Sequence, residues 1–314
     1  MADGLQPEGL VLEGFLPEGP AVVALGGGHG LATALRAIRQ YAGAITAVVT
    51  VADDGGSSGR LRRDLGVPPP GDIRRCLVAL SGDDAVWPVA FEHRFRDGEL
   101  EGHALGNLVL VGLTETLGSF VDALDEAGRL LGAVGRVLPA TLEPVVLKAE
   151  LADATSTRGQ VVEGQVAVAN SHHIRRVELV PADVMATPDA VEAIARADQI
   201  VYAPGSLYTS LLPVLSVRGL RDAITASRAR VVQVSNLRPQ VPETAGMDAA
   251  DLVAAVLAHD ARVDTFLHDT GDGLPLDAAR VLALGVEPVA APVAREHGLA
   301  HDPERLARAL CALL

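Results

Sequence analysis

The segment VTVADDGGSSGR, which runs from Val49 to Arg60, brings carboxylates, hydroxyls, glycines and a guanidinium into one short stretch. Its first residues are apolar and β-branched, as in a buried strand, so the polar residues follow a strand end. Backbone amides and hydroxyls bind phosphate oxygens, arginine pairs with them through two parallel donors, and a carboxylate binds Mg²⁺. We therefore predict a phosphate-binding loop, whose candidate ligand-binding residues are Asp53, Asp54, Gly55, Gly56, Ser57, Ser58, Gly59 and Arg60. Asp53 or Asp54 is the candidate Mg²⁺ ligand; in a dinucleotide enzyme, an acid here would instead bind ribose.

A glycine-rich stretch, LGGGHGLAT, precedes this segment and joins a predicted strand to a predicted helix. Glycines there allow the backbone to approach an anion, and the helix N-terminus offers unpaired amides. The stretch departs from the dinucleotide fingerprint, because Thr33 stands where a third glycine is expected. A tight turn without a ligand is the alternative. The candidate ligand-binding residues in this stretch are Gly26, Gly27, Gly28 and Gly30.

Two stretches around predicted helix starts add further polar residues. In PPPGDIRR, Asp72 is well placed to cap the helix that follows, while Arg74 in its first turn can face the site. In EGHALGNLVL, His103 and Asn107 flank a helix start, and a purely structural role is the alternative for the histidine. We include all four residues among the candidates for ligand binding.

The stretches APGSLYTS and VSNLRPQVPETAG also follow predicted strands. The first has the form of another strand-to-helix anion site. It is not the elbow of a serine hydrolase, because Tyr208 stands where that motif requires a second glycine. In the second stretch, Asn236 is a candidate for binding the edge of a base or sugar. The candidates in the first stretch are Gly205, Ser206, Tyr208, Thr209 and Ser210.

The composition argues against several other functions. A net charge of −14 disfavours a nucleic-acid-binding face, which needs clustered Lys and Arg. Lys148 is the only lysine in the sequence, so no glycine-rich loop carries the lysine of a P-loop. Cys76 and Cys311 lie far apart, and the adjacent histidines 172 and 173 have no second pair at ligand spacing, so no structural zinc site is predicted. Spacing alone identifies no general base.

These loops need a scaffold that brings the ends of several strands together. From residue 21 onward, apolar runs alternate with helical periodicities, which predicts an α/β, Rossmann-like, doubly wound and mostly parallel sheet with helices on both faces. Ligands in such folds bind outside the carboxyl ends of the strands. Residues 136–182 have the alternation of a β-rich insertion, and residues 1–20 predict a disordered tail. We expect one domain over residues 21–314, without a signal peptide or a membrane span.

Several long motifs occur in a fixed order and together resemble one family. VALGGGHGLATALR, ITAVVTVADDGGSSGRLR, PPPGDIRRCLVAL, GHALGNLVL, ADQIVYAPGSLYTSLLP and SNLRPQVPET resemble the YvcK group of bacterial gluconeogenesis factors, within the CofD-like superfamily. The resemblance covers roughly residues 21 to 270. It implies a Rossmann-like fold, a cytoplasmic location, and a role in growth and cell shape on gluconeogenic carbon sources. It also implies a bound nucleotide sugar of the UDP-N-acetylglucosamine type, in a cleft that the loops above line.

Two functions are compatible with this resemblance. The first is a non-catalytic regulator that binds a nucleotide-diphosphate sugar and acts on cell-wall synthesis proteins or regulatory proteins. Assembly of the chain into a homo-oligomer is compatible with this function. The second is a Mg²⁺-dependent transferase like the CofD relatives, which move a phospholactyl group from a guanosine diphospho carrier to a deazaflavin; there Asp53 or Asp54 would be catalytic. We favour the first, because an aromatic content of 3% offers little for a flat tricyclic acceptor. The match thins after residue 270, which leaves the identity of the sugar open.

Overall fold

The computed structural model of this chain describes residues 18–82, 85–152, 160–271 and 273–314. Most of the tail predicted over residues 1–20 lies outside the described residues. The first strand begins at Ala21, where the alternating pattern of the sequence begins.

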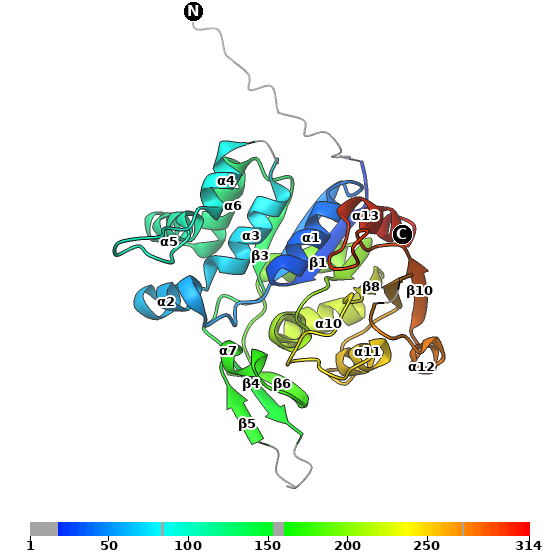
Figure 1. Ribbon diagram of the computed structural model, residues 1–314. Helices are drawn as coiled ribbons and strands as arrows, with labels where there is room; N and C mark the ends of the chain where they lie inside the picture. Colours follow the sequence, from blue (N-terminus) through cyan, green and yellow to red (C-terminus); the bar gives the residue numbers. More distant parts are fainter. Residues whose placement is uncertain (1–17, 83–84, 153–159, 272) are drawn as a thin grey trace, which may run out of the picture.

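The main sheet has seven parallel strands in the order β10-β9-β8-β7-β1-β2-β3. This sheet, with helices packed against it, confirms the predicted Rossmann-like α/β fold (Figure 1). The strands are short and rich in Val, Ile and Ala, as expected where both faces of a parallel sheet are buried. Their bounds are β1 Ala21–Gly26, β2 Ala44–Val49, β3 Arg136–Pro139, β7 Gln199–Tyr202, β8 Arg230–Val234, β9 Thr265–Asp269 and β10 Glu287–Ala291.

Helices cover both faces of this sheet. On one face α1 packs against α3 and α13, and on the other α10 packs against α8 and α9, as right-handed crossovers in opposite directions require. The bounds are α1 Gly28–Ile38, α2 Gly56–Leu65, α3 Pro70–Leu80, α4 Val86–Glu92, α5 Leu105–Leu117, α6 Phe120–Leu131, α7 Gln165–Ala169, α8 Pro188–Arg196, the π-helical turn η1 Leu207–Leu211, α9 Leu212–Ser216, α10 Arg218–Ala226, α11 Ala249–Leu257, α12 Ala278–Ala283 and α13 Pro303–Cys311.

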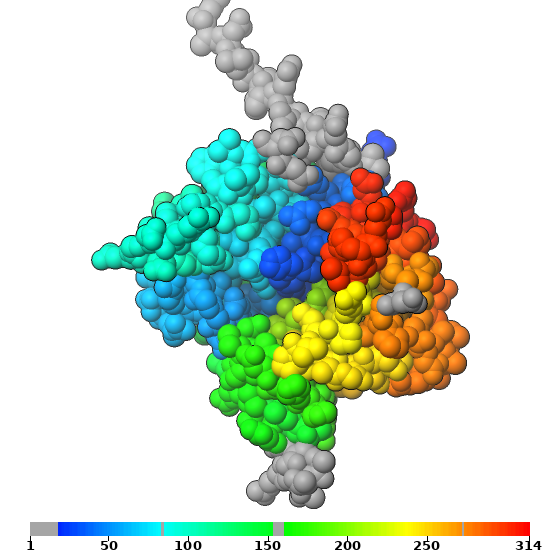
Figure 2. Space-filling view, in the orientation of Figure 1, coloured from blue at the N-terminus to red at the C-terminus, as the bar shows by residue number. Residues whose placement is uncertain are grey.

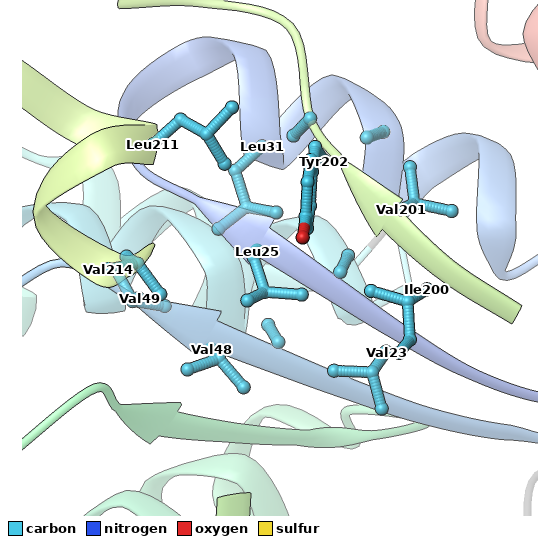
Figure 3. Packing of buried hydrophobic residues seen from close by; sticks show 14 of the residues in the cluster. Val23, Leu25, Leu31, Val48, Val49, Ile200, Val201, Tyr202, Leu211 and Val214 are labelled. Carbon is cyan, nitrogen blue, oxygen red and sulfur yellow. The ribbon is translucent and has the colours of Figure 1, made fainter. Parts of the chain in front are cut away.

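The core sits between the central strands and these helices. Figure 3 shows Leu25 of β1 and Tyr202 of β7 beside Leu31 of α1, and all three side chains are buried. Since β1 lies between β2 and β7, the chain leaves β1 toward one edge of the sheet and later leaves β7 toward the other. The carboxyl ends of β1 and β7 therefore form the topological switch point, where folds of this kind bind ligands.

A small antiparallel sheet, with the order β5-β4-β6, forms the insertion. Its elements are β4 Val146–Leu151, β5 Gln160–Glu163, α7 and β6 Ile174–Val180, and they project from the main body below α2 in Figure 1. The insertion starts later than the predicted residue 136, because Arg136–Pro139 pairs in parallel with β2 as an edge strand of the main sheet. A short edge strand and an insertion strand have the same alternation, so the sequence pattern did not separate them.

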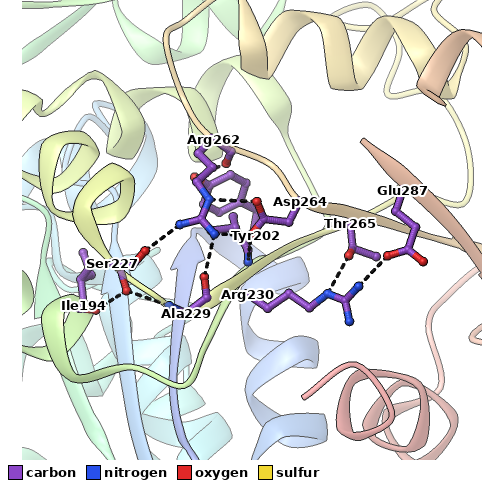
Figure 4. A network of polar contacts seen from close by, with 10 residues as sticks. Ile194, Tyr202, Ser227, Ala229, Arg230, Arg262, Asp264, Thr265 and Glu287 are labelled. Carbon is purple, nitrogen blue, oxygen red and sulfur yellow. Dashed lines mark hydrogen bonds and ion pairs between the residues drawn. The ribbon is translucent and has the colours of Figure 1, made fainter. Parts of the chain in front are cut away.

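An ion pair and its hydrogen bonds hold the amino ends of β8 and β9, at the end of the sheet away from the switch point. Arg262 forms hydrogen bonds with Asp264 at 2.7 and 2.8 Å and donates to the Ser227 carbonyl, while Asp264 accepts from the Val231 amide (Figure 4). The Tyr202 hydroxyl donates to the Arg262 carbonyl at 2.9 Å. These groups satisfy one another's hydrogen-bonding capacity, so we assign this cluster a structural role.

Candidate functional site

The glycine turns after β1 and β7 lie against each other at the switch point. A Cβ atom on Gly30 would overlap the carbonyl oxygen of Pro204, so only glycine allows this approach. A Cβ atom on Gly27 would lie 2.7 Å from Asp72 Oδ2 and 3.2 Å from Ser210 Oγ. Segments that are far apart in the sequence therefore meet here. In Figure 2 the blue surface of the first strand and helix lies between the light-blue, green and yellow segments that follow it.

A polar cavity of about 300 Å³ opens between the loop after β2 and helices α3 and α5. Its lining combines carboxylates, guanidinium groups, hydroxyls and the glycines at the start of α2. Most of these residues were candidates for ligand binding from the sequence, and Gly71, Arg75, Arg94 and Gln165 are additions. The lining residues are Asp53, Gly55, Gly56, Ser57, Ser58, Gly71, Asp72, Arg74, Arg75, Arg94, Asn107 and Gln165.

The adjacent residues Asp53 and Asp54 have different roles. Asp53 lines the cavity, and its Oδ1 accepts from the Gly55 amide at 3.0 Å. Burial raises the pKa of Asp53, and the negative charge of Asp72 adds to that shift. The two carboxylate oxygens of Asp54 instead accept the Gln165 and Val166 amides, each at 3.0 Å, at the start of α7. Asp54 therefore ties the β2 loop to the insertion.

Asp72 does not cap its helix, although its position suggested a cap. The N-cap of α3 is Pro69, and Asp72 lies inside the first turn, where it pairs with Arg75 at 2.7 Å. Its other oxygen lies close to Gly27, as described above. Proline at the helix start fixes the backbone without a side-chain cap. The Asp72 carboxylate therefore lines the cavity together with that of Asp53.

Ser57 joins α2 to α5 through two side chains. Its Oγ lies 3.0 Å from His103 Nδ1 and accepts from Asn107 Nδ2 at 3.1 Å. Burial, followed by the nearby charges of Arg60 and Arg94, lowers the pKa of His103, which favours the neutral ring. Because the amide group donates to Ser57, the serine hydroxyl is free to donate to the ring. Asn107 is 2% exposed, and its Oδ1 has no hydrogen-bond partner.

Arg74, Arg94 and Arg60 differ in their hydrogen-bond partners and in their position relative to the cavity. Arg74 is 2% exposed and pairs through Nη2 with Glu92 at 3.2 Å, while its Nε and Nη1 have no partner. Buried donors without a partner are costly, so they mark a place where a ligand or water completes the bonding. Arg94 is exposed and donates to the Gly102 carbonyl. Arg60 points elsewhere: it donates to the Glu101 carbonyl at 2.8 Å and is not among the lining residues.

The turn after β7 is held by residues that follow β8. Asn236 accepts from the Gly205 amide at 2.6 Å and donates to the Gly205 carbonyl at 2.8 Å. The Glu243 carboxylate accepts from the Tyr208 amide at 2.5 Å and from the Ser206 hydroxyl at 2.6 Å. Glu243 is not among the residues predicted from the sequence, although it lies in the VSNLRPQVPETAG stretch as an acid among turn residues. Burial also raises the pKa of the Tyr208 hydroxyl to about 12.

The carboxylates at the cavity are compatible with Mg²⁺ bound together with a ligand. Among the described residues, no group of three or more His, Cys, Asp or Glu side chains could hold a metal ion. Magnesium is usually held by one or two carboxylates together with substrate phosphates and waters, so an all-protein site is not required. Asp53 and Asp72 would supply the carboxylates.

The family described as "2-phospho-L-lactate transferase CofD" matches residues 22–296. This range includes every segment of the candidate site. The chain belongs to the CofD family.

Individual proteins are also similar to this chain. A gluconeogenesis factor of Listeria monocytogenes is 40% identical and covers 94% of this chain and 96% of its own length. A putative gluconeogenesis factor of Nostoc sp. is 45% identical over 77% of this chain, which spans only 52% of that longer protein. The crystal structure of a UPF0052 protein from Bacillus halodurans has a TM-score of 0.88 at 38% identity and covers 94% of this chain. Across the described residues, no helix is long and apolar enough to cross a membrane.

Proposed function

We propose that this chain is a cytoplasmic, non-catalytic regulatory protein that binds a nucleoside diphosphate sugar of the UDP-N-acetylglucosamine type. The observation that carries the proposal is the polar cavity at the carboxyl ends of the strands, where Asp53, Asp72 and Arg74 meet the glycine-rich start of α2. A diphosphate needs amide donors, cations and a metal-binding acid, and the cavity has all three.

The phosphates would lie at the start of α2. Gly55, Gly56 and Ser57 are at the N-terminus of this helix, where the backbone amides have no intrahelical partner. Arg75 and Arg94 would neutralise phosphate charge, and the unpartnered nitrogens of Arg74 favour an anion nearby. When bound, Mg²⁺ would neutralise the charge of the diphosphate, with Asp53 and Asp72 as its protein ligands.

The nucleoside and the sugar would lie on either side of the diphosphate. Ligands of doubly wound sheets extend across the switch point, which here lies at the β1 and β7 turns. In these relatives the name gluconeogenesis factor indicates a role in carbon metabolism. We propose that binding links the supply of a nucleotide sugar to growth, cell shape and cell-wall synthesis, through a protein partner that recognises the bound form.

A CofD-type phospholactyl transferase is the second candidate, favoured by the family description and by the Asp53–Asp72 pair. Such an enzyme must also hold a flat deazaflavin. The residues that line the cavity include no aromatic side chain on which such a ring could stack. The second candidate is tested by incubating the protein with a guanosine diphospho-phospholactate donor, a deazaflavin and Mg²⁺, and product formation would favour it over the regulator.

Isothermal titration of the protein with UDP-N-acetylglucosamine tests the binding function. We expect Arg94→Gln to weaken binding about tenfold or more, because a hydrogen bond to a charged group contributes about 1.5–3 kcal/mol. Arg96→Gln is the matched control, since Arg96 is exposed on the same loop and does not line the cavity. Equal affinity of the wild type and the Arg94 variant would contradict the assignment of the phosphates to this cavity.

A further inference from the structure

The turn after β7 has the form of an anion site that the chain itself fills. Glu243 is 6% exposed, and its carboxylate accepts from the Tyr208 and Thr209 amides at 2.5 and 3.2 Å. It also accepts from the Ser206 hydroxyl at 2.6 and 2.7 Å. Backbone amides and a hydroxyl at the start of a helical segment are the donors that hold phosphate in other proteins. Here an internal carboxylate already uses them.

Part of the capping of this segment does not involve the glutamate, which accepts the Tyr208 amide. Ser206 is the N-cap of η1, and its hydroxyl oxygen accepts from the Thr209 amide at 3.1 Å. Asn236 holds Gly205 independently through the two hydrogen bonds described above. Glu243 comes from a segment beyond β8 and adds a buried charge, and burial raises the pKa of its carboxyl group. Burying a carboxylate is costly, so its presence indicates a role beyond capping.

We infer that Glu243 determines ligand specificity: its carboxylate takes the place of a phosphate in the β7 turn and confines the phosphates of a bound nucleotide to the cavity beside α2. This inference rests on the nucleotide-binding function proposed above. A second anion beside a buried carboxylate is strongly disfavoured, because like charges repel in a low-dielectric site. The β7 turn is therefore left to the uncharged part of the ligand, the ribose or the base.

Inorganic phosphate is the probe for this role, because it needs no nucleotide. In Glu243→Ala the Tyr208 amide loses its acceptor and the Thr209 amide keeps only the Ser206 hydroxyl. We expect the variant to bind phosphate about tenfold more tightly than the wild type. Glu243→Gln is the matched control, since the amide fills the same space and keeps an oxygen for both backbone donors. We expect it to bind phosphate as the wild type does. Acetate should raise the melting temperature of Glu243→Ala but not that of the wild type or of Glu243→Gln, because it replaces the missing carboxylate.

Phosphate binding by Glu243→Ala that is no tighter than that by Glu243→Gln would overturn the inference. If the alanine variant does not fold in ordinary buffer, Glu243→Ser opens the same amides and keeps a polar side chain. Folding of either variant only in phosphate or acetate would support the inference. Failure of both to fold even there would overturn it, because the glutamate would then be a structural requirement that no anion replaces.

Titration with UDP and UMP separates this inference from the proposed function. If phosphates bind only beside α2, the ratio of UDP to UMP affinity falls in Arg94→Gln and rises in Glu243→Ala, where the β7 turn becomes available to a phosphate. An unchanged ratio in Glu243→Ala would overturn the inference while leaving nucleotide binding intact. If neither UDP nor UMP binds the wild type, the proposed function fails, and the result with inorganic phosphate still decides whether Glu243 fills an anion site.

Discussion

Asp54 joins the β2 loop to the insertion, since its carboxylate accepts the Val166 amide at 3.0 Å across 112 positions of sequence. The same carboxylate accepts the neighbouring Gln165 amide at 3.0 Å, and Gln165 lines the polar cavity. If the proposed ligand binds in this cavity, the β2 loop would contact it on one side and the insertion on the other, and could transmit binding to that insertion.

Asp54→Ala should loosen the insertion without removing a cavity carboxylate. Each hydrogen bond to the charged group contributes about 1.5–3 kcal/mol, and partial exposure reduces this, so we expect a loss of about 1–3 kcal/mol in the free energy of unfolding. Hydrogen exchange should become faster at residues 165–169 than in the main sheet. Glu163→Gln, on an exposed position of β5, is the control. Unchanged exchange in α7 would show that the contact is dispensable.

Asp53→Asn should stabilise the unliganded protein and weaken Mg²⁺-dependent ligand binding. Because the pKa of Asp53 is raised in the folded protein, the fold holds this proton to a higher pH than the unfolded chain does. Stability therefore falls as the pH rises from about 3.9, the ordinary pKa of Asp, through the folded-state value, and the variant avoids this loss. Urea unfolding at neutral pH measures the gain. A variant less stable than the wild type there would mean that the ionised carboxylate supports the fold.

His259 should make the protein sensitive to acid. Its Nε2 accepts from the Val177 amide of β6 at 3.1 Å and its Nδ1 contacts the Ala255 carbonyl at 2.7 Å, an arrangement that requires the neutral ring. Burial lowers the pKa of His259, so the unfolded chain takes up a proton first, and stability is lost as the pH falls below about 6.5 toward the folded-state pKa.

His259→Gln tests this, because an amide can accept and donate in the same places without titrating. Between pH 7 and pH 5, urea midpoints should fall less steeply in the variant than in the wild type. A residual slope is expected, since burial also lowers the pKa of His301. Identical slopes would assign the acid sensitivity to other groups.

Gly30→Ala should be far more damaging than Gly28→Ala. The added methyl group at Gly30 would overlap the Pro204 carbonyl and force the β1 and β7 turns apart, which should cost more than about 3 kcal/mol. At Gly28 a methyl group would meet open space, and the cost of about 1–2 kcal/mol comes only from its φ of +60°. Thermal unfolding of both variants measures the difference, and equal losses would mean that the turns can separate freely.

Hydrophobic periodicity in the sequence was sufficient to predict the sheet, because a strand and its neighbouring helix bury local, regularly spaced side chains. The predicted strand ends placed Gly27, Asp53 and Ser57 at one edge of that sheet. In the structure Asp53 and Ser57 line one cavity, and Asp72 lies between that cavity and Gly27. The start of the insertion was less predictable, since Arg136–Pro139 has the same alternation as the strands that follow it.

What the sequence determined, then, was which strand ends carry polar residues, since that follows from local pattern alone. The tertiary structure decided their roles. Asp53 and Asp54 are adjacent and chemically identical, but only the folded chain places the α7 amides against one of them. Arg94 and Glu243 reach the site from irregular segments, where no periodicity constrains side-chain direction. Such contacts depend on long-range packing, so neighbouring residues in the sequence carry no signal for them.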